Sequence, residues 1–544
     1  MIVPTRECLF VSKIAEYLNK HMLGEVTADP TIRARYATDN SVLSIMPDIV
    51  AYPRVTNDIR KAMRFAWQLA MKGHVLPLIP RGSGTDKTGG SIGKGMIIAM
   101  STHMNRVYEY DPKQKLVRLQ PGTTISALQS ALGVHGTSIP LLEYESSVAS
   151  VGGALSRSRH SLKSVHKLEV VLASGDVIQT GRLSKHELAK KKKMQTFEGD
   201  IYREIDSLID ENKKLIEDKL SYDAGLDHAG FAGIAEVRTK EGFDLTPLFL
   251  GTQGTLGVIS EMILKAEYVN QTPAIVVAAF NKSVDAHDAI DAAEQCNPSG
   301  LEYIEGKYFE RAKVQGKEFP FYTDATTENT VAAVLVATFN DFSERARSRK
   351  VKQLAKIFSE LGGTVDFAKD ETVSELHGVR DVVSYSLMHD SVHEATPPII
   401  DGVFVPIDRF EDFTKAVEQL AHDNKVELPI FGRPMDELWY TRPILRLETV
   451  SDKQKMLRLI HDYEKVVSDH NGLLFGDSGE GRLKNFIAER GDKDLLHMYA
   501  QVREIFDPHG FLNTGVKQAG RAAELGKHLV SRYEPSRAGE LPQF

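Results

Sequence analysis

A glycine-rich segment between two apolar runs constrains this chain most strongly. Residues 79–100 read IPRGSGTDKTGGSIGKGMIIAM and contain six glycines, one arginine and several hydroxyl side chains. Glycine adopts backbone conformations that other residues avoid and lets a ligand approach the main chain closely. Successive backbone N–H groups in such a loop can bind an anion such as a phosphate. The alternative interpretation is a surface loop that binds nothing.

The spacing of the loop excludes two common phosphate-binding motifs. The pattern GxxxxGK[ST] of a P-loop does not occur here. Gly82 and Gly84 form G-x-G, but Lys87 occupies the third glycine position of a dinucleotide fingerprint, and a strand rather than a helix is expected next. A nest of backbone N–H groups is therefore favoured, with Ser83, Thr85 and Thr88 as additional hydroxyl donors.

Length and composition limit the class of protein. A chain of 544 residues is expected to form two or three domains, and 42% hydrophobic and 26% charged residues are typical of a globular, cytoplasmic protein. The net charge of −7 argues against nucleic acid as a partner. No apolar run reaches the roughly 18 residues of a membrane span, and no signal peptide is expected.

The two cysteines, Cys8 and Cys296, are too few for an iron–sulfur or four-cysteine zinc site. Reduced thiols in the cytoplasm are the simpler interpretation, and a disulfide is the alternative. Redox chemistry would therefore need a bound organic cofactor.

Hydrophobic patterning predicts an α+β fold in several parts. Residues 270–450 show the order strand–helix–strand–strand–helix–strand, which is typical of a ferredoxin-like layer. The other predicted parts are a helical segment over 1–45, an α/β domain over 46–269 with a helical insertion at 182–245 that includes one long helix over 199–220, a helical segment over 451–517, and a tail over 518–544 without a convincing core element.

Several segments together resemble one family. PRGSGTDKTGG resembles the pyrophosphate loop, P-R-G-[GS]-G-T-x-x-[ST]-G-G, of FAD-dependent enzymes of the vanillyl-alcohol oxidase type. Residues 248–265 resemble L-x-x-G-S-E-G-T-L-G-V-I-T of the FAD-linked 2-hydroxy-acid dehydrogenases. Further segments of similar pattern and order lie at 33–59, 117–132, 150–156 and 506–515. The nearest relatives look like D-lactate, D-2-hydroxyglutarate and glycolate dehydrogenases.

This resemblance implies a PCMH-type FAD-binding domain of two α/β subdomains, a cap domain, and a C-terminal segment that returns to the FAD domain. Asn513 would approach the isoalloxazine ring. The loop contains no histidine for covalent attachment, so non-covalent FAD is expected. The residues that the resemblance assigns to the cofactor are Pro80, Arg81, Gly82, Ser83, Gly84, Thr85, Gly89, Gly90, Pro121, Gly152, Gly153, Gly254, Thr255, Gly257, Ile259 and Asn513.

The sequence departs from the family in its metal-binding motifs. G-H-x-x-x-G-x-x-H-x-R-P aligns with residues 431–445, where Arg433 and Tyr440 replace the two histidines. G-E-H-G-x-G aligns with residues 476–484, where Asp477 and Ser478 replace glutamate and histidine. In the family the metal helps to bind the hydroxy acid, and a nearby histidine is thought to take the hydroxyl proton. No metal is expected in this chain.

Without a metal, other groups must bind the substrate anion and take its proton. Arg433, Arg442 and Arg380 are candidates for the carboxylate because a guanidinium matches its two oxygens. Tyr440 could donate a hydrogen bond or act as a base, and His389 or His393 could be the base. The alternatives are solvated histidines and an ion pair of Arg433 with Asp436 or Glu437.

The resulting prediction is an FAD-dependent oxidoreductase that transfers a hydride from a small 2-hydroxy acid to the flavin. Oxygen, a quinone or a separate protein would reoxidise the flavin. A sugar, lactone or polyol oxidase and a catalytically decayed FAD-binding protein are the alternatives. The basic run Lys190–Lys193 could contact a membrane surface peripherally, although a solvated charge run is the simpler interpretation.

Overall fold

The computed structural model divides the chain into two compact units. Unit 1 comprises Met1–Glu267 and Asp477–Val530, and unit 2 comprises Tyr268–Gly476 and the residues from Ser531 on. The structure describes residues 6–139, 146–220, 227–270, 272–317, 319, 322, 330–367, 378–386, 394–400, 402–488 and 491–533, with the side chains of 6–10 left out.

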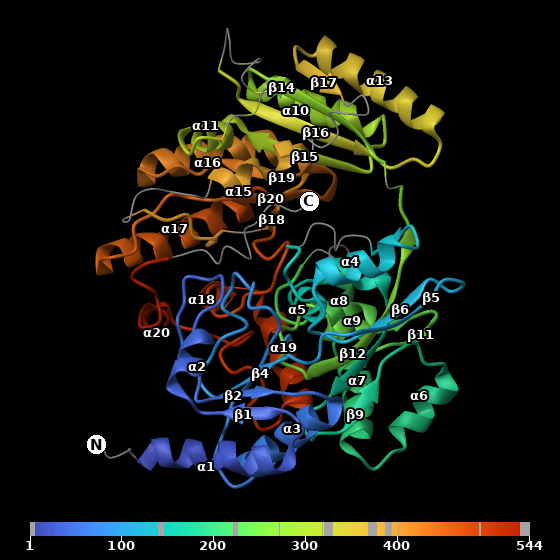
Figure 1. The fold of residues 1–544 in the computed structure, drawn as a ribbon, viewed down its shortest axis with the longest axis vertical. Helices are drawn as coiled ribbons and strands as arrows, with labels where there is room; N and C mark the ends of the chain where they lie inside the picture. Colours follow the sequence, from blue (N-terminus) through green and yellow to red (C-terminus); the bar gives the residue numbers. More distant parts are fainter. Residues whose placement is uncertain are drawn as a thin grey trace. The chain divides into compact units, whose positions relative to one another are not determined.

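A four-stranded sheet in unit 1 leads into the glycine-rich loop. Its strands are β1 (Glu25–Thr27), β2 (Ile49–Tyr52), β4 (Met96–Ala99) and β3 (Leu78–Arg81), in that order across the sheet. The last three are parallel, and β1 is antiparallel to β2. Helices α1 (Arg6–His21) and α3 (Thr56–Ala70) share a hydrophobic core with the sheet, and α2 (Pro30–Arg35) follows β1 (Figure 1).

The segment predicted as helical over 1–45 thus contains the short strand β1 besides α1 and α2. A strand of three residues is too short to show an alternating pattern, and its hydrogen bonds go to β2, a partner more than twenty residues away. The edge position in the sheet follows from tertiary pairing and not from local propensity.

A five-stranded antiparallel sheet forms the second layer of unit 1. Its order is β5 (Val107–Asp111), β6 (Leu116–Leu119), β12 (Val258–Lys265), β8 (Val165–Val171) and β9 (Val177–Gln179). Side chains of α7 (Phe197–Glu211) and α19 (Lys493–Phe506) belong to the core cluster of this sheet. The remaining elements of unit 1 are α4 (Ile125–Gly133), β7 (Thr137–Ser138), α5 (Val151–Arg157), α6 (Lys185–Lys192), α8 (Lys213–Lys219), β10 (Arg238–Thr239), β11 (Gly242–Phe243), α9 (Thr246–Phe249), α18 (Asn485–Ala488) and α20 (Ala522–Gly526).

The helical insertion differs from the sequence prediction in one respect. The single helix expected over 199–220 is broken at Asn212 into α7 and α8. Two lysines of the basic run are engaged in ion pairs, Lys191 with Glu198 at 2.5 Å and Lys192 with Asp206. These contacts neutralise half of the run within the insertion itself.

Unit 2 contains a seven-stranded antiparallel sheet. Its order is β17 (Thr364–Phe367), β14 (Ala274–Phe280), β16 (Ala333–Phe339), β15 (Gly300–Glu305), β19 (Ile430–Arg433), β20 (Leu438–Thr441) and β18 (Val403–Phe404). The first four strands have the chain order and crossovers of a ferredoxin-like layer, as the sequence predicted. The helices of this unit are α10 (Ser283–Glu294), α11 (Gly306–Val314), α13 (Glu344–Glu360), α15 (Val382–Ser386), α16 (Phe410–Asn424) and α17 (Val450–Asp469) (Figure 1).

The segment after residue 517 also contributes to the fold. Leu529 forms an isolated β-bridge with Leu43, and Val530 N donates a hydrogen bond to Val42 O at 2.9 Å. Leu525 and Leu529 are each 7% exposed. The expectation that this tail lacks a core element was wrong for these residues, because scattered apolar residues give no periodic signal when their partner lies far away in the sequence.

Among the helices of the described ranges, none is long and apolar enough to cross a membrane.

Candidate functional site

The glycine-rich loop connects β3 to β4 at the edge of the four-stranded sheet. Gly84, Gly89 and Gly95 have φ values of +78°, +76° and +117°, which side chains rarely tolerate. A Cβ atom at Gly84 would lie 2.3 Å from Arg81 Nη2. The Arg81 guanidinium therefore packs directly beneath the loop, where its Nη1 donates to Ser91 O at 3.4 Å.

The first part of the loop presents accessible backbone donors. Ser83 is exposed, and Gly84 and Thr85 are half-buried. Their N–H groups donate no hydrogen bond to any other residue in the described ranges. By contrast, Thr88 N and Gly90 N are bound to the Asp86 carboxylate at 2.6 and 3.2 Å. The unbonded amides of 83–85 are the kind of donor set that phosphate oxygens require.

Two further segments that the sequence assigned to the cofactor lie against this loop. A Cβ atom at Gly82 would lie 1.7 Å from Ser150 Oγ, and Gly152 N donates to Pro121 O at 2.9 Å. The Ser150 side chain also caps α5, because its Oγ accepts a hydrogen bond from Gly153 N at 3.3 Å. The structure thus joins the loop, the Pro121 turn and the first turn of α5.

Next to the Pro121 turn, the hydroxyl of Thr123 is fully buried, and its Oγ1 has no hydrogen-bond partner among the described residues. Such a hydroxyl has donor and acceptor capacity for a ligand.

The segment after α9 also packs against the glycine-rich loop. Gly254, with φ +74°, would place a Cβ atom 2.6 Å from Pro80 Cγ. Thr255 is fully buried and its hydroxyl donates to Thr252 O at 2.8 Å. Further along, Gly257 and Ile259 lie where this segment enters β12, in which Ile259 is 8% exposed and pairs with Val170.

Asn513 ties the loop to the C-terminal segment. Its side chain is fully buried, and Nδ2 donates to Gly90 O at 2.7 Å and to Gln253 O at 2.6 Å. Its Oδ1 accepts from Arg482 Nη2 at 2.8 Å. Arg482 Nη1 donates in turn to Gly89 O at 2.7 Å. These contacts hold the backbone of Gly89–Gly90 in place.

The half-buried carboxyl groups of Asp39 and Asp86 lie close to these arginines. Burial and the neighbouring charge of Asp86 raise the pKa of Asp39 to about 6, and Asp39 Oδ2 accepts from Ser91 Oγ at 3.0 Å. Burial lowers the pKa of Arg482 to about 10 and shifts the pKa of Arg81 downward as well. The carboxyl groups of the two aspartates and the guanidinium groups of the two arginines beneath the loop therefore offset one another within the protein.

Asp477, at a position where the family has a metal-binding glutamate, is paired with Arg157 and lies near His160. Its Oδ2 accepts from Arg157 Nη1 at 2.7 Å, and its Oδ1 lies 3.7 Å from His160 Nε2. The sequence analysis assigned no role to Arg157 or His160. In the described part of the chain, no three His, Cys, Asp or Glu side chains are grouped so that they could hold a metal ion.

Glu480, three residues further on, forms a buried ion pair with Lys517 at 2.9 Å. Lys517 Nζ also donates to His228 O at 2.7 Å, and Gly230 N donates to Glu480 Oε1 at 2.6 Å. The C-terminal segment is thereby fixed to residues 228–230.

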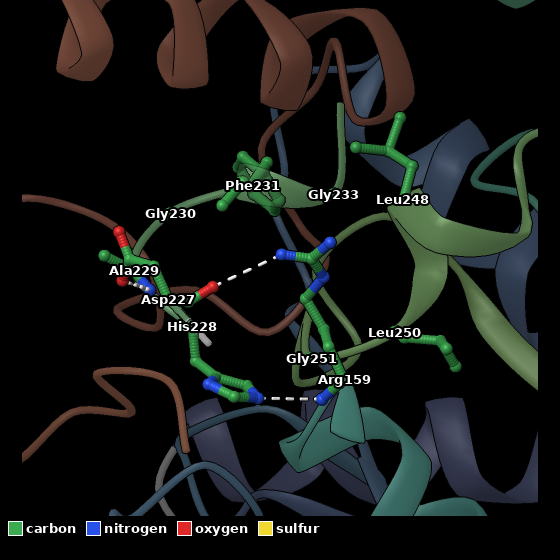
Figure 2. Close-up of a pocket in the computed structure, with 11 residues that line it drawn as sticks. Arg159, Asp227, His228, Ala229, Gly230, Phe231, Gly233, Leu248, Leu250 and Gly251 are labelled. Atoms are coloured by element: carbon green, nitrogen blue, oxygen red, sulfur yellow. Dashed lines mark hydrogen bonds between the residues drawn. The ribbon is translucent and has the colours of Figure 1, made fainter. Parts of the chain in front are cut away.

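A small pocket in unit 1 lies beside these contacts (Figure 2). Arg159 N donates to His228 Nε2 at 2.8 Å, and the Arg159 guanidinium reaches Asp227 O at 3.3 Å. Phe231 and Leu248 contribute apolar walls. Burial lowers the pKa of His228 well below its usual value and raises the pKa of Asp227 to about 6. Both groups are therefore pushed toward their neutral forms.

Four of the five predicted catalytic residues gather on one face of the unit 2 sheet. Glu302 of β15 lies opposite Arg433 of β19, by extension of the pairing of Tyr303 with Gly432. Arg380 forms an ion pair with Glu302, and Arg433 Nε lies 2.8 Å from Asp436 Oδ2. The ion pair of Arg433 with Asp436, which the sequence analysis gave as an alternative, is therefore present, and the role of Arg433 in substrate binding stays a prediction.

Tyr440 and Arg442 lie around an aromatic ring on the same face. Tyr440 stacks on Phe431 with ring centroids 5.1 Å apart, and the Arg442 guanidinium lies 5.7 Å from the centre of the Phe431 ring. Arg442 is 3% exposed. The remaining candidates, His393 and His389, lie outside the described residues.

The sequence analysis missed several side chains that hold these segments together, namely Arg482, Gln253, Glu480 and Lys517. Gln253 was signalled only by its place in the segment 248–265, where the family pattern has glutamate. The others lie in the altered or terminal segments, and their contacts join residues up to 393 positions apart. A single sequence offers no local pattern for such contacts.

Comparison with known proteins identifies the family. The profile described as "FAD binding domain" matches residues 47–181, and that described as "FAD linked oxidases, C-terminal domain" matches residues 269–516. The chain belongs to the FAD-linked oxidases and dehydrogenases, and FAD is its cofactor. The glycine loop with its unbonded amides and the buried Thr123 hydroxyl fit such a group.

Individual relatives agree with this assignment. The chain is 24% identical to D-2-hydroxyglutarate dehydrogenase of Pantoea ananatis over 90% of its own length and 50% of the relative's. It is 21% identical to glycolate oxidase subunit GlcD of Bacillus subtilis, covering 86% of this chain and 88% of that one. The chain spans about half the length of the first curated relatives that it matches.

The fold is that of PCMH-type flavoenzymes, as the sequence predicted. 4-Ethylphenol oxidase from Gulosibacter chungangensis matches with a TM-score of 0.66 at 11% identity, over 95% of this chain and 98% of that one. p-Cresol methylhydroxylase matches with a TM-score of 0.65 at 12% identity, over 95% and 97% of the two chains.

Proposed function

We propose that this FAD-dependent oxidoreductase oxidises a small 2-hydroxy acid, of the D-2-hydroxyglutarate, D-lactate or glycolate kind, without a metal ion. The names of the relatives support the substrate class. The observation that carries the absence of a metal is the pairing of Asp477 with Arg157 at 2.7 Å. A carboxylate held by a guanidinium is a poor ligand for a divalent cation.

In this proposal the glycine loop holds the cofactor. The N–H groups of Ser83, Gly84 and Thr85 bind the pyrophosphate of non-covalent FAD, and Arg81 supports the loop from below with its positive charge. The remaining positions assigned by resemblance surround the rest of the cofactor. When bound, FAD accepts a hydride from the substrate.

The carboxylate of the substrate is bound by arginines of unit 2. Arg433 and Arg442 stand in the altered motif, and Arg380 lies on the same sheet face. A guanidinium can bind both carboxylate oxygens, and two of the three already have carboxylate partners, Glu302 for Arg380 and Asp436 for Arg433. Tyr440 is in place to donate a hydrogen bond, and His393 stays a candidate base.

The test is anaerobic reduction of the flavin. The purified holoprotein is mixed with both enantiomers of 2-hydroxyglutarate and lactate, and with glycolate, while flavin absorbance is followed. We expect one of these acids to bleach the flavin, with a preference for the D-enantiomer. If all leave the flavin oxidised, the substrate proposal fails. Metal analysis of the same sample is expected to find less than stoichiometric zinc and manganese.

The second candidate function is oxidation of a sugar, lactone or polyol. The replacement of the family's histidines by Arg433 and Tyr440 favours it, because the changed residues stand where the hydroxy acid would bind. Bleaching by a panel of such compounds, with no response to the hydroxy acids, would support it. A decayed FAD-binding protein would retain flavin and respond to neither group.

A further inference from the structure

His160 is a histidine of unit 1 to which the proposed function gives no role. It lies three residues beyond the end of α5, and its side chain is 16% exposed. Its Nε2 lies 3.7 Å from Asp477 Oδ1, and its ring centroid lies 4.9 Å from that of His228. The imidazole is thus held beside a carboxylate while part of it remains accessible.

This histidine lies near a motif that has lost its basic side chain. Ser478 replaces the histidine of the family pattern G-E-H-G, and a serine hydroxyl is a poor base at neutral pH. His160 contacts Asp477, the residue directly before Ser478. An imidazole is therefore supplied to the same segment by the residues that follow α5.

The cluster around His160 is continuous with the residues expected at the flavin ring. Gly479 N donates to Arg157 O at 3.4 Å, and a Cβ atom at Gly479 would lie 2.8 Å from Gln253 Oε1. Gln253 O accepts from Asn513 Nδ2 at 2.6 Å. These steps lead from His160 to Asn513 within unit 1.

We propose that His160, whose imidazole lies beside the Asp477 carboxylate, accepts the hydroxyl proton of the substrate at Nδ1. This inference rests on the proposed function and adds the proton acceptor. The O–H bond breaks and its proton goes to His160. The C–H bond breaks with its electron pair, which goes as a hydride to the FAD. A C=O bond forms, and the hydroxy acid loses two electrons to become a 2-oxo acid.

The surroundings of the ring suit this role. The Asp477 carboxylate lies 3.7 Å from Nε2, beyond hydrogen-bond distance, and its negative charge stabilises the imidazolium that forms. Arg157 holds that carboxylate from the other side at 2.7 Å. The His228 ring lies beside that of His160, Arg159 precedes it in the chain, and Lys517 contacts the backbone of His228. Burial keeps the pKa of His228 low, so His228 is neutral and does not repel the imidazolium.

The first test measures the pH dependence of flavin reduction in the holoenzyme under anaerobic conditions. In the wild type, we expect the rate to rise about tenfold per pH unit at low pH and then to level off. His160→Asn is expected to retain flavin, to be reduced at least about 100-fold more slowly, and to lose the rising limb. The control is His166→Asn, an exposed histidine of β8 that should behave like the wild type.

Two more variants distinguish the residue that accepts the proton from the residue that only supports it. Asp477→Asn is expected to move the rising limb to lower pH because the imidazolium loses its carboxylate, and Asp477→Glu should move it back toward the wild type. A His393→Asn variant that loses the rising limb while His160→Asn keeps it would overturn the proposal.

The second test does not depend on turnover. Oxalate, a planar dianion resembling a deprotonated hydroxy acid, is titrated into oxidised holoenzyme while flavin absorbance is followed. If His160 carries the proton, the Kd rises about tenfold per pH unit above the pKa of the base, and His160→Asn abolishes this dependence. An unchanged dependence in His160→Asn, or no oxalate binding by the wild type, overturns the proposal.

The two proposals fail separately. A wild type reduced by a hydroxy acid, with His160→Asn equally fast and equally pH-dependent, overturns only the role of His160. A wild type inert to the hydroxy acids, with oxalate binding that depends on His160, overturns only the substrate assignment.

Discussion

The glycine loop in unit 1 and the arginine face in unit 2, which comprises Arg380, Arg433 and Arg442, offer different kinds of groups to an anion. In the loop, the accessible groups are backbone amides, and the polar side chains behind them are buried and bonded to one another. On the sheet face, the accessible groups are long side chains, and Arg380 and Arg433 already have carboxylate partners.

This difference has a consequence for function. Amides of 83–85 are free to bind a phosphate without breaking an existing contact, because their donors are unused within the described residues. An arginine already paired with a carboxylate must share or exchange its partner when a substrate anion arrives. In the proposed function, cofactor binding is therefore preorganised in unit 1, whereas substrate binding by the arginines of unit 2 would depend on neighbouring charges.

The largest effect is expected where the loop is fastened. Asn513→Gly removes two hydrogen bonds to the backbone and one partner of buried Arg482, while glycine tolerates the local φ of +39°. We expect a loss of about 4 kcal/mol in stability and loss of bound flavin, because each buried group left unpaired costs about 1–3 kcal/mol. Denaturant unfolding and flavin content measure this.

The matched control for this variant lies in unit 2. Asn471→Gly makes the same change at an exposed residue with φ +58°. It should leave both flavin content and stability close to the wild type. Equal losses in the two variants would show that Asn513 acts through its backbone alone.

The second prediction concerns the pH dependence of the loop's support. The pKa of Asp39 is about 6 in the folded state against 3.8 when unfolded, because of burial and the nearby Asp86. The folded state therefore binds the proton more tightly, and stability falls as pH rises from about 4 to about 6. The contribution is at most about 3 kcal/mol.

Asp39→Asn isolates this contribution. The amide keeps an acceptor for Ser41 and can donate to Ser91 Oγ, so the fold should persist. Relative to the variant, the wild type should lose stability between pH 4.5 and 7 in urea unfolding of the FAD-free protein. Asp218→Asn, at an exposed position, should run parallel to the wild type. A constant difference between wild type and Asp39→Asn would contradict the assignment.

The same contrast, between backbone groups in the loop and side chains on the sheet face, explains how much of each region the sequence could predict. The loop was recognisable because its function lies in the backbone, and glycines at fixed spacing record the backbone conformation. The ferredoxin-like order in unit 2 was readable from apolar periodicity. The partner of Arg433, three residues further along the chain, was among the alternatives, whereas the partner of Asp477 could not be predicted, since ion pairs leave no periodic pattern. Arg157 lies 320 residues from Asp477 in the chain.

The third prediction tests whether crowding at the loop matters beyond backbone strain. Gly84→Ala places a Cβ atom 2.3 Å from Arg81 Nη2, whereas Gly73→Ala has nothing within 4 Å, and their φ values are +78° and +83°. Both variants pay about 1–2 kcal/mol in left-handed strain. Only Gly84→Ala should also weaken FAD binding, by about 30-fold, corresponding to about 2 kcal/mol.

A fluorescence titration of the FAD-free protein with FAD gives the two dissociation constants. If both variants bind FAD as the wild type does, the loop tolerates a side chain at Gly84 and the proposed pyrophosphate contact there is wrong.

The smallest effect is expected on the arginine face. It shows whether substrate binding there depends on the neighbouring carboxylates. Asp436→Asn releases Arg433 from a partly exposed ion pair, which contributes less than about 1 kcal/mol to stability. If Arg433 binds the substrate carboxylate, removal of the competing Asp436 carboxylate should lower KM for the hydroxy acid about threefold while kcat changes little. The control is Glu427→Gln, which breaks the pair with Arg311 in the same unit. A KM that rises in Asp436→Asn would mean that Asp436 orients Arg433 for binding, and the arginine face would then be as preorganised as the glycine loop.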